Sequence, residues 1–236
     1  MKKILLFIIA SLSINFAMSQ ITSTTTGGNW SETSTWIGGV VPTATDDVII
    51  DGTVYHNNKS DVCLNLTINS EKLLTSLDSK MNGWPLKILG DLINNGIIRN
   101  NDAGNWLQLS IAKNITNNGV WTNYGVSLIG DSDQVFSGTE PFASYFIQTQ
   151  KENKIIAGSD ISFLGTTLLF YNNNIFHIGP GKTIFLYYSE DQIRGEFMPP
   201  TNMALGVQFR GGGTVYVGSK YNIDKSKFDG VTVTKE

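Results

Sequence analysis

The most direct indication of the fold is a repeat near the middle of the chain. Its first copy reads Gly90-Asp91-Leu92-Ile93-Asn94-Asn95-Gly96-Ile97-Ile98-Arg99-Asn100, and its second copy reads Ala112-Lys113-Asn114-Ile115-Thr116-Asn117-Asn118-Gly119-Val120-Trp121-Thr122-Asn123. The copies align on Asn-Asn-Gly, which places Gly119 23 residues after Gly96. One turn of a β-solenoid uses a period in this range for two or three short strands and their corners. Asparagine suits such corners because it tolerates the left-handed backbone conformation and its amide can bond to the asparagine one rung above.

The same repeat has a second interpretation, in which each Asn-Gly pair is the two-residue turn of a β-hairpin. The chain would then fold as an antiparallel β-sandwich. Outside the repeat, short β-branched or aromatic runs recur between turns, and no segment has a helical stripe with caps. The sequence therefore predicts an all-β protein and leaves open, at this point, whether its strands are parallel or antiparallel.

The start of the chain has the three parts of a secretory signal. Lys2 and Lys3 precede an apolar run from Ile4 to Ile14, and Ala17-Met18-Ser19 follows as a small-x-small cleavage site. The apolar run is shorter than the roughly 20 residues that a membrane-spanning helix needs, so we expect no membrane insertion. Residues 1–19 are therefore predicted to be a signal peptide, and we expect the mature protein to be secreted, at the cell surface or in the periplasm.

Charge and cysteine content argue against several classes of protein. Without Lys2 and Lys3, 15 basic residues remain against 20 acidic ones. This acidic excess argues against a nucleic-acid partner, which requires clustered Lys and Arg. The single cysteine, Cys63, cannot form an internal disulfide, so burial and hydrogen bonding have to stabilise the exported chain. We expect Cys63 itself to be a small buried hydrophobe.

Two further segments resemble a known family. The first contains Trp30, then Trp36-Ile37-Gly38-Gly39-Val40-Val41-Pro42, then Asp46-Asp47-Val48-Ile49-Ile50-Asp51-Gly52-Thr53-Val54. It resembles the start of the β-helical domains of secreted and surface proteins of Bacteroidota, and it is similar to the N-terminal half of the eight-glycine domain of animal surface proteins. The second is Val126-Ser127-Leu128-Ile129-Gly130-Asp131-Ser132-Asp133-Gln134-Val135-Phe136-Ser137-Gly138-Thr139. It resembles the strand, glycine-rich corner and Gln-x-x-x-Gly step of those domains.

The resemblance implies a parallel β-helix, and the repeat supplies its period. We expect residues 20–236 to form a single right-handed parallel β-helix, with residues 27–60 as its N-terminal capping region. About 217 residues follow the predicted signal peptide, and one rung per 23 residues gives about nine rungs. The antiparallel β-sandwich stays the alternative.

Carboxylates are the first candidates for catalysis or metal binding. β-Helix enzymes that cut acidic polysaccharides use clustered carboxylates to hold calcium or to protonate a leaving oxygen. Asp46 and Asp47 are adjacent and would point to opposite faces of a strand, so we expect them to start the strand after the Pro42 turn. Asp131 and Asp133 could share a face and hold a cation, but Asp-Ser-Asp beside a glycine is an ordinary turn composition. We therefore expect no metal site and no cofactor.

Nucleophilic and nucleotide chemistry lack sequence support. The two histidines, His56 and His177, lie near no candidate nucleophile with an orienting acid, and we expect them to be solvent-facing or capping residues. The sequence contains no Gly-x-Ser-x-Gly elbow, no phosphate-binding loop and no Cys-x-x-Cys pair. The sequence therefore predicts that the protein is not an enzyme.

Aromatic side chains are the better functional candidates, because flat rings can hold sugar rings without charge. The candidate glycan-binding residues are Trp30, Trp36, Trp84, Trp106 and Trp121, with Tyr124, Tyr187 and Tyr188 beside them. For Trp30 and Trp36 we favour the alternative that they cover the first rung of the solenoid, and for the other residues we favour core positions. The aromatic residues from Phe163 to Tyr188 fit rings that stack inside or outside successive rungs.

These observations predict a non-catalytic exported or cell-surface protein with a structural or adhesive role that contacts glycans. Its expected partners are an extracellular or cell-wall polysaccharide and a cell-surface protein. Two alternatives stay open, a polysaccharide lyase or hydrolase on a β-helix and a stand-alone carbohydrate-binding module.

Overall fold

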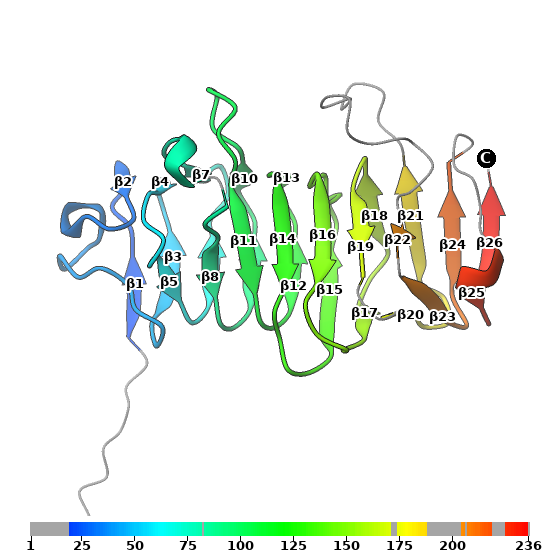
Figure 1. Ribbon diagram of the computed structural model, residues 1–236. Coiled ribbons are helices and arrows are strands. Elements are labelled where there is room, and N and C mark those ends of the chain that lie inside the picture. Colours follow the sequence, from blue (N-terminus) through cyan, green and yellow to red (C-terminus); the bar gives the residue numbers. More distant parts are fainter. Residues whose placement is uncertain are drawn as a thin grey trace, which may run out of the picture.

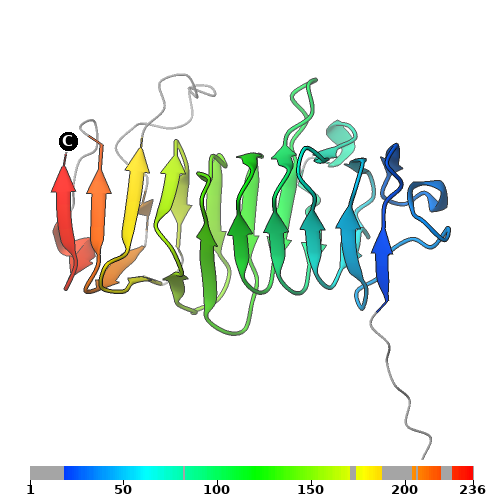
Figure 2. The same ribbon diagram turned by 180° about the vertical axis from the view of Figure 1, so that it is seen from behind.

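The computed structural model of the protein describes residues 19–81, 83–170, 174–187, 204–205, 207–218 and 225–235. Residues 1–18, which make up nearly all of the predicted signal peptide, lie outside the described residues. The described chain forms one elongated stack of short strands, with its N-terminal and C-terminal rungs at opposite ends (Figure 1). The same regular stack is seen from behind (Figure 2).

The strands belong to four sheets, which we number I to IV. Sheet I has ten strands: β1 (Gln20–Thr22), β3 (Asp47–Ile50), β6 (Leu66–Ile68), β9 (Leu92–Asn94), β12 (Ile115–Asn117), β15 (Gln134–Gly138), β17 (Ile155–Ala157), β20 (Ile175–Ile178), β23 (Gln208–Gly211) and β25 (Phe228–Asp229). Sheet II has five: β2 (Gly27–Asn29), β4 (Thr53–His56), β7 (Leu73–Ser76), β10 (Ile97–Arg99) and β13 (Val120–Thr122).

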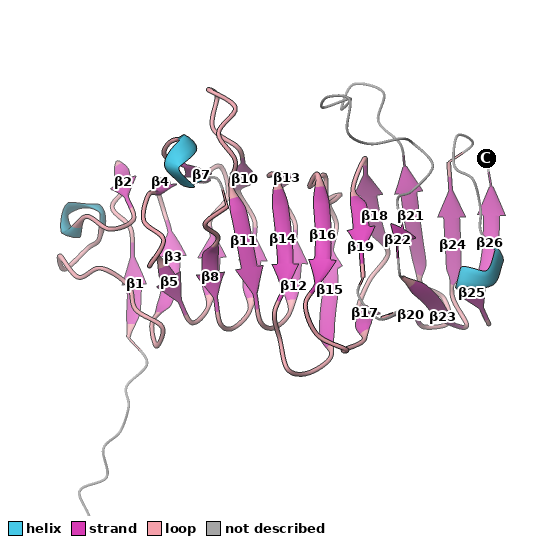
Figure 3. Cartoon of the chain, viewed as in Figure 1, coloured by secondary structure: helices cyan, strands magenta, loops and turns pink. Residues whose placement is uncertain are grey.

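The other two sheets complete the sides of the stack. Sheet III has seven strands: β5 (Val62–Cys63), β8 (Leu86–Ile88), β11 (Gln108–Ile111), β14 (Gly125–Leu128), β16 (Phe146–Thr149), β19 (Thr167–Leu169) and β22 (Ala204–Leu205). Sheet IV has four: β18 (Ile161–Leu164), β21 (Thr183–Tyr187), β24 (Thr214–Val217) and β26 (Thr232–Lys235). Three short 3-10 helices, η1 (Thr33–Thr35), η2 (Ser79–Met81) and η5 (Lys225–Lys227), lie outside the sheets (Figure 3). None of the helices among the described residues is long and apolar enough to cross a membrane.

From β3 to β14 the chain visits sheets I, II and III in turn, so each circuit adds one strand to each of these sheets. From β18 onward, sheet IV takes the place of sheet II. Neighbouring strands within the sheets are parallel, as in the pairings of β9 with β12 and of β10 with β13. The chain is thus a β-solenoid of about 8 turns. The predicted parallel β-helix is confirmed, and the antiparallel sandwich is wrong, because the Asn-Gly pairs turn the chain into the next sheet instead of back along the same strand.

The repeat that predicted the solenoid lies in register on successive rungs. Leu92 pairs with Ile115 and Asn94 with Asn117. The Asn94 amide donates to Asn117 Oδ1 at 2.8 Å across a separation of 23 residues, and both side chains are buried. The predicted asparagine ladder is therefore confirmed. The rungs themselves are unequal, because hydrogen-bonded residues on successive rungs are separated by 18 residues at Asp47, by 26 at Asp91 and by 21 at Ser144.

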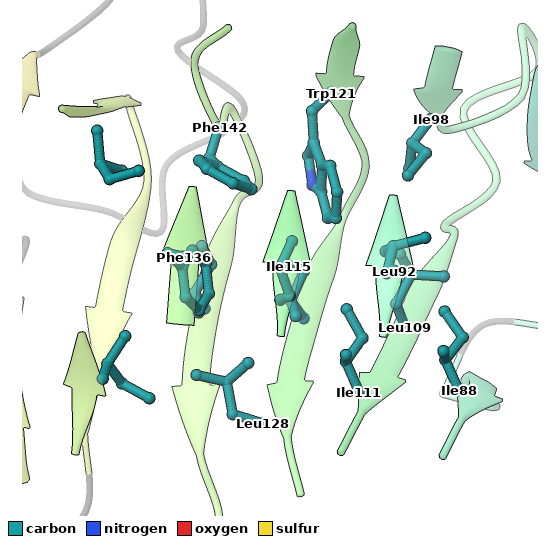
Figure 4. Packing of buried hydrophobic residues seen from close by; sticks show 14 of the residues in the cluster. Ile88, Leu92, Ile98, Leu109, Ile111, Ile115, Trp121, Leu128, Phe136 and Phe142 are labelled. Atoms are coloured by element: carbon teal, nitrogen blue, oxygen red, sulfur yellow. The ribbon is translucent and has the colours of Figure 1, made fainter. Parts of the chain in front are cut away.

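The core is a continuous column of apolar side chains between the sheets (Figure 4). Alternation along each strand sends one side chain inward and the next outward. In β13, for example, Trp121 is buried while Val120 is 51% exposed. The C-terminal rungs use aromatic residues at the inward positions: Phe136, Phe142, Phe163, Phe170, Phe176 and Phe209 are buried. Between successive rungs the rings of Phe176 and Phe209 stack with centroids 6.1 Å apart.

The aromatic segment from Phe163 to Tyr188 places rings on both sides of the wall. Phe163, Phe170 and Phe176 lie inside the solenoid, whereas Phe185 and Tyr187 are half-buried on the outward positions of β21. The latter two rings stack with centroids 5.8 Å apart. Tyr188 lies outside the described residues.

Two tryptophans are buried at the N-terminal end of the stack. Trp30 and Trp36 are buried, and their rings meet edge to face with centroids 5.0 Å apart. The indole Nε1 of Trp36 donates to the Trp30 carbonyl at 2.7 Å, and the Trp30 amide donates to the Tyr55 carbonyl in the next rung at 2.9 Å. These contacts fasten the segment around η1 to the next rung.

Candidate functional site

The exposed aromatic residues of the central rungs gather along one edge of the solenoid, where the chain passes from sheet II to sheet III. We call this edge the II–III corner. Its segments are residues 57–61, 77–85, 100–107 and 123–124 on successive rungs. Residues 77–81 and 100–107 form longer segments that project beyond the stack (Figure 1). The longer corner segments therefore protrude from the surface of the N-terminal half.

Three rings stack at the corner, one from each of three successive rungs. Trp106 and Tyr124 lie with ring centroids 4.1 Å apart and planes 4° from parallel. Tyr124 and Tyr145 follow at 5.3 Å and 11°. We call Trp106, Tyr124 and Tyr145 the aromatic column. Because parallel strands are spaced about 4.8 Å apart, one ring per rung at the same corner falls naturally into stacking distance.

Phe146 supports the column from the side. Its ring meets Tyr124 edge to face, with centroids 5.4 Å apart and planes at 88°. It lies over Gly125, where an added Cβ would be 2.3 Å from Phe146 Cζ. Glycine at position 125 therefore leaves the space that the Phe146 ring occupies.

A buried polar network fixes the backbone beneath the column. Asn123 is fully buried, and its Oδ1 accepts hydrogen bonds from Trp121 Nε1 at 2.8 Å and from the Ser144 hydroxyl at 2.6 Å. Its Nδ2 donates to the carbonyls of Leu107 at 3.2 Å and Gly125 at 2.9 Å. One side chain thus joins three rungs, and this satisfies polar groups that would otherwise be costly to bury.

The column forms one wall of an open groove of about 740 Å³. The residues that line this groove are Arg99, Asn100, Asn101, Asp102, Gly104, Trp106, Thr122, Tyr124 and Tyr145. The rest of the lining comes from Arg99, Thr122 and residues 100–102 and 104, and we call these residues the polar wall. The shape of the segment 100–107 depends on its own amides, since Asn101 Oδ1 accepts from the Asn105 amide and Asn100 Oδ1 from the Leu107 amide, both at 2.9 Å. Asn101 Nδ2 also donates to the Leu77 carbonyl on the preceding rung at 3.0 Å.

An ion pair lies in the polar wall. Both terminal nitrogens of Arg99 donate to the carboxylate of Asp102, the Nη2 contact being 3.3 Å. This hydrogen bonding lowers the pKa of Asp102 and raises that of Arg99. Burial, and then the nearby Tyr145, raise the pKa of Tyr124 above its ordinary value. At neutral pH the groove therefore carries one positive and one negative side chain, Arg99 and Asp102, which are bonded to each other.

Trp84 lies on the same corner one rung before Trp106. It is 50% exposed, and Lys59 Nζ lies 5.6 Å from the centre of its ring. Its carbonyl oxygen is 2.8 Å from His56 Nε2. His56 was expected to be a solvent-facing or capping residue. It does not face solvent, because its side chain is fully buried and its Nδ1 lies 2.9 Å from Asp61 Oδ2.

Asp61 explains the burial of His56. Its Oδ2 also accepts hydrogen bonds from the backbone amides of Asn57 and Asn58, each at 3.0 Å. The pair therefore organises the corner segment 57–61 and holds the Trp84 backbone. The other histidine, His177, is half-buried at an outward position of β20.

The structure divides the five predicted glycan-binding tryptophans into two groups. Trp30, Trp36 and Trp121 are 0%, 2% and 2% exposed, so their assignment as sugar platforms is corrected: their rings pack inside the solenoid and present no face to a ligand. Trp84 and Trp106 are 50% and 40% exposed and both lie on the II–III corner. Apart from Trp106 and Tyr124, the lining residues of the groove were not predicted as site residues: Arg99, Asn100, Asn101, Asp102, Gly104, Thr122 and Tyr145. The repeat could have indicated Tyr145. One turn of the solenoid separates Asn123 from Ser144 by 21 residues, and Tyr145 follows Tyr124 by the same number.

The carboxylates considered from the sequence have structural contacts. Asp46 Oδ2 accepts from the Thr43 amide at 2.8 Å, and Asp47, the first residue of β3, accepts from Asn65 Nδ2 at 2.7 Å. Asp131 is paired with Lys151, and Asp133 accepts from the Lys154 amide at 3.0 Å. Among the described residues, no group of three or more His, Cys, Asp or Glu side chains is placed to hold a metal ion.

Cys63 is buried in the wall of the solenoid. The thiol is fully buried, and burial, followed by the charges of Asp47 and Asp46, raises its pKa. It therefore remains a neutral thiol with the packing role that was predicted from the sequence.

Comparisons with known proteins add no family to this description: no protein-family model, no curated protein and no solved structure matches the chain.

Proposed function

We propose that this protein is a non-catalytic exported protein that contacts a carbohydrate chain through the groove of the II–III corner. The observation that carries the proposal is the aromatic column beside a polar wall, in a groove lined by Trp106, Tyr124, Tyr145, Arg99 and Asn101. Mixed apolar and hydrogen-bonding walls are typical of ligand sites. Sugars fit them because each ring has C–H groups for an aromatic surface and hydroxyls for amides and ions.

The arrangement of the rings decides how a sugar would bind. Within the column the ring faces lie against one another, so Tyr124 offers mainly its edge. Trp106 is the end ring of the column with 40% of its surface exposed, and it is the residue on which we place the main apolar contact. The hydroxyls of the same sugar would then face Arg99, Asn101 and Asp102 across the groove.

We propose a non-catalytic function because of the number of carboxyl groups in the groove. Glycosidases of the usual kind need two carboxyl groups on either side of the scissile bond. The described lining of this groove includes one, Asp102, and its oxygens accept from Arg99. The proposed export rests on Lys2, Lys3 and the apolar run that follows them, and it agrees with the resemblance to β-helical surface proteins of Bacteroidota.

A glycan array with residues 20–236 tests the proposal. We expect binding by the parent protein and its loss on Trp106→Ala, because the end ring of the column is removed. Ile37→Ser is the matched control, since Ile37 is 64% exposed in the N-terminal loop and lies outside the groove. A blank array, or equal binding by the parent and Trp106→Ala, would contradict the proposal.

A further inference from the structure

The charges of the groove point to the class of carbohydrate, in an inference that rests on the proposed function. Arg99 and Asp102 are the only lining residues among those described that are charged at neutral pH. They bond in the forked geometry that matches a guanidinium to a carboxylate, with Nη1 on Oδ1 and Nη2 on Oδ2. The polar wall is therefore neutral overall, and the anion-binding side of Arg99 is already occupied by a group of this chain.

An acidic sugar would meet this pair unfavourably. Its carboxylate would have to replace Asp102 on Arg99, or lie beside a second carboxylate that is 84% exposed. The carboxylate of the sugar and that of Asp102 would repel each other, and the acidic excess of the whole chain adds to the repulsion.

A neutral sugar leaves the pair intact. A guanidinium has five N–H donors and a carboxylate has about four acceptor positions, so both groups keep hydrogen-bonding capacity after they bond to each other. Hydroxyl groups can accept from Arg99 and donate to Asp102 at the same time. We infer that the groove selects uncharged glycans. Asp102 is then the specificity-determining residue, because it occupies Arg99, the one cation among the described lining residues that could hold a uronic acid.

The test uses polymers that share a backbone and differ in charge. Hydroxyethylcellulose and carboxymethylcellulose form one pair, and methyl-esterified and de-esterified galacturonan form the other. Affinity electrophoresis compares the parent protein, Asp102→Asn and Asp131→Asn. The Asp131→Asn variant is the matched control, because it removes the same charge from another exposed ion pair, with Lys151, outside the groove.

We expect the parent protein to be retained by a neutral polymer and not by its charged counterpart. Asp102→Asn should gain about fivefold in affinity for the charged polymer, the range of one exposed ion pair, and this gain should vanish at high salt. Asp131→Asn should not show the gain. Circular dichroism melts of the three proteins should coincide, since both aspartates are exposed.

Two results overturn the inference alone, and one overturns the proposed function as well. Preference of the parent protein for the charged polymers shows that the pair does not exclude acids. Equal gains in Asp102→Asn and Asp131→Asn show that net charge, and not the pair, sets the selectivity. Retention of no protein by any of the four polymers, together with a blank glycan array, overturns both the inference and the proposed function.

Discussion

Individual residues of the repeat show what a sequence pattern can and cannot tell. Alternation along a strand says that one residue of each adjacent pair faces inward. It does not say which one, because Ile97-Ile98 and Val120-Trp121 are apolar at both positions. The structure places Ile98 and Trp121 inside, both 2% exposed or less, with Ile98 paired to Trp121. A large tryptophan was a reasonable candidate for the surface, but the asparagine and serine that bond to its indole allow it to lie inside.

A charge at one of these positions tests the register. Ile98→Asp should lower the free energy of unfolding by about 4 kcal/mol or more, because an unpaired carboxylate would be buried. Val120→Asp should lower it by less than about 1 kcal/mol, since Val120 is 51% exposed. Urea unfolding curves of the two variants give both values. Similar losses in the two would show that the inward and outward positions are assigned wrongly.

Gly125 and Phe146 form a second test at this scale. Gly125→Ala should push the Phe146 ring away from Tyr124 and cost about 1–3 kcal/mol of stability, because the added methyl group overfills the site. Phe146→Ala removes the ring with which the added methyl group at position 125 would clash. A double-mutant cycle in thermal or urea unfolding should therefore give less than the sum of the two single losses, and strict additivity would mean that the two positions do not share this space.

At the scale of elements, the sheets were more predictable than the corners. The 23-residue offset and the Asn-Asn-Gly match predicted the period of a rung and the asparagine ladder, because strands in successive rungs must keep register. The choice of parallel strands over an antiparallel sandwich depended on the resemblance to β-helical domains. The groove depends instead on how long each corner is and on where its side chains point. Nothing in the spacing of Arg99, Asp102 and Trp106 alone shows that their segment folds back on its own asparagines to face Tyr124 and Tyr145.

The aromatic column should be visible in a tyrosine titration. The Tyr124 pKa is raised, so the folded state keeps the phenolic proton that the unfolded chain loses near pH 10. The contribution of protonated Tyr124 to the free energy of unfolding is therefore fully present below about pH 10. It is lost as the pH rises through the pKa that Tyr124 has in the folded state. Tyr145→Phe should lower the Tyr124 pKa, because a nearby ionisable phenol is removed. Nuclear magnetic resonance of labelled tyrosine measures the shift, and an unchanged pKa would contradict the coupling.

For the whole molecule, stability is a sum over neighbouring rungs, and the ends have one neighbour fewer. At the N-terminal end, Trp30 and Trp36 bury their rings against each other, and we predict that they cover the first rung. The stack would then have a protected first rung, and contacts such as the Asn123 network tie its centre together across three rungs.

Removal of the Trp36 ring tests whether the N-terminal end of the solenoid needs a cover. Trp36→Ala should lower the free energy of unfolding by about 3–5 kcal/mol and should promote self-association, because it uncovers an apolar end and a strand edge. Trp84→Ala is the control, and a loss below about 1 kcal/mol is expected there because the ring is half exposed. Calorimetry and analytical ultracentrifugation measure the two effects. A stable, monomeric Trp36→Ala protein would show that the end needs no cover.

The unequal segments of the II–III corner have an evolutionary consequence. β11 and β14 stay paired along their whole length, from Gln108 with Gly125 to Ile111 with Leu128, although a long segment leads into the first strand and a two-residue link into the second. Doubling the length of a loop costs only about 0.6 kcal/mol in closure entropy, so the corner tolerates insertions and deletions that the strands do not feel. The solenoid is thus a modular scaffold, on which a recognition surface can be exchanged by transplanting one loop while the register of every rung is inherited unchanged.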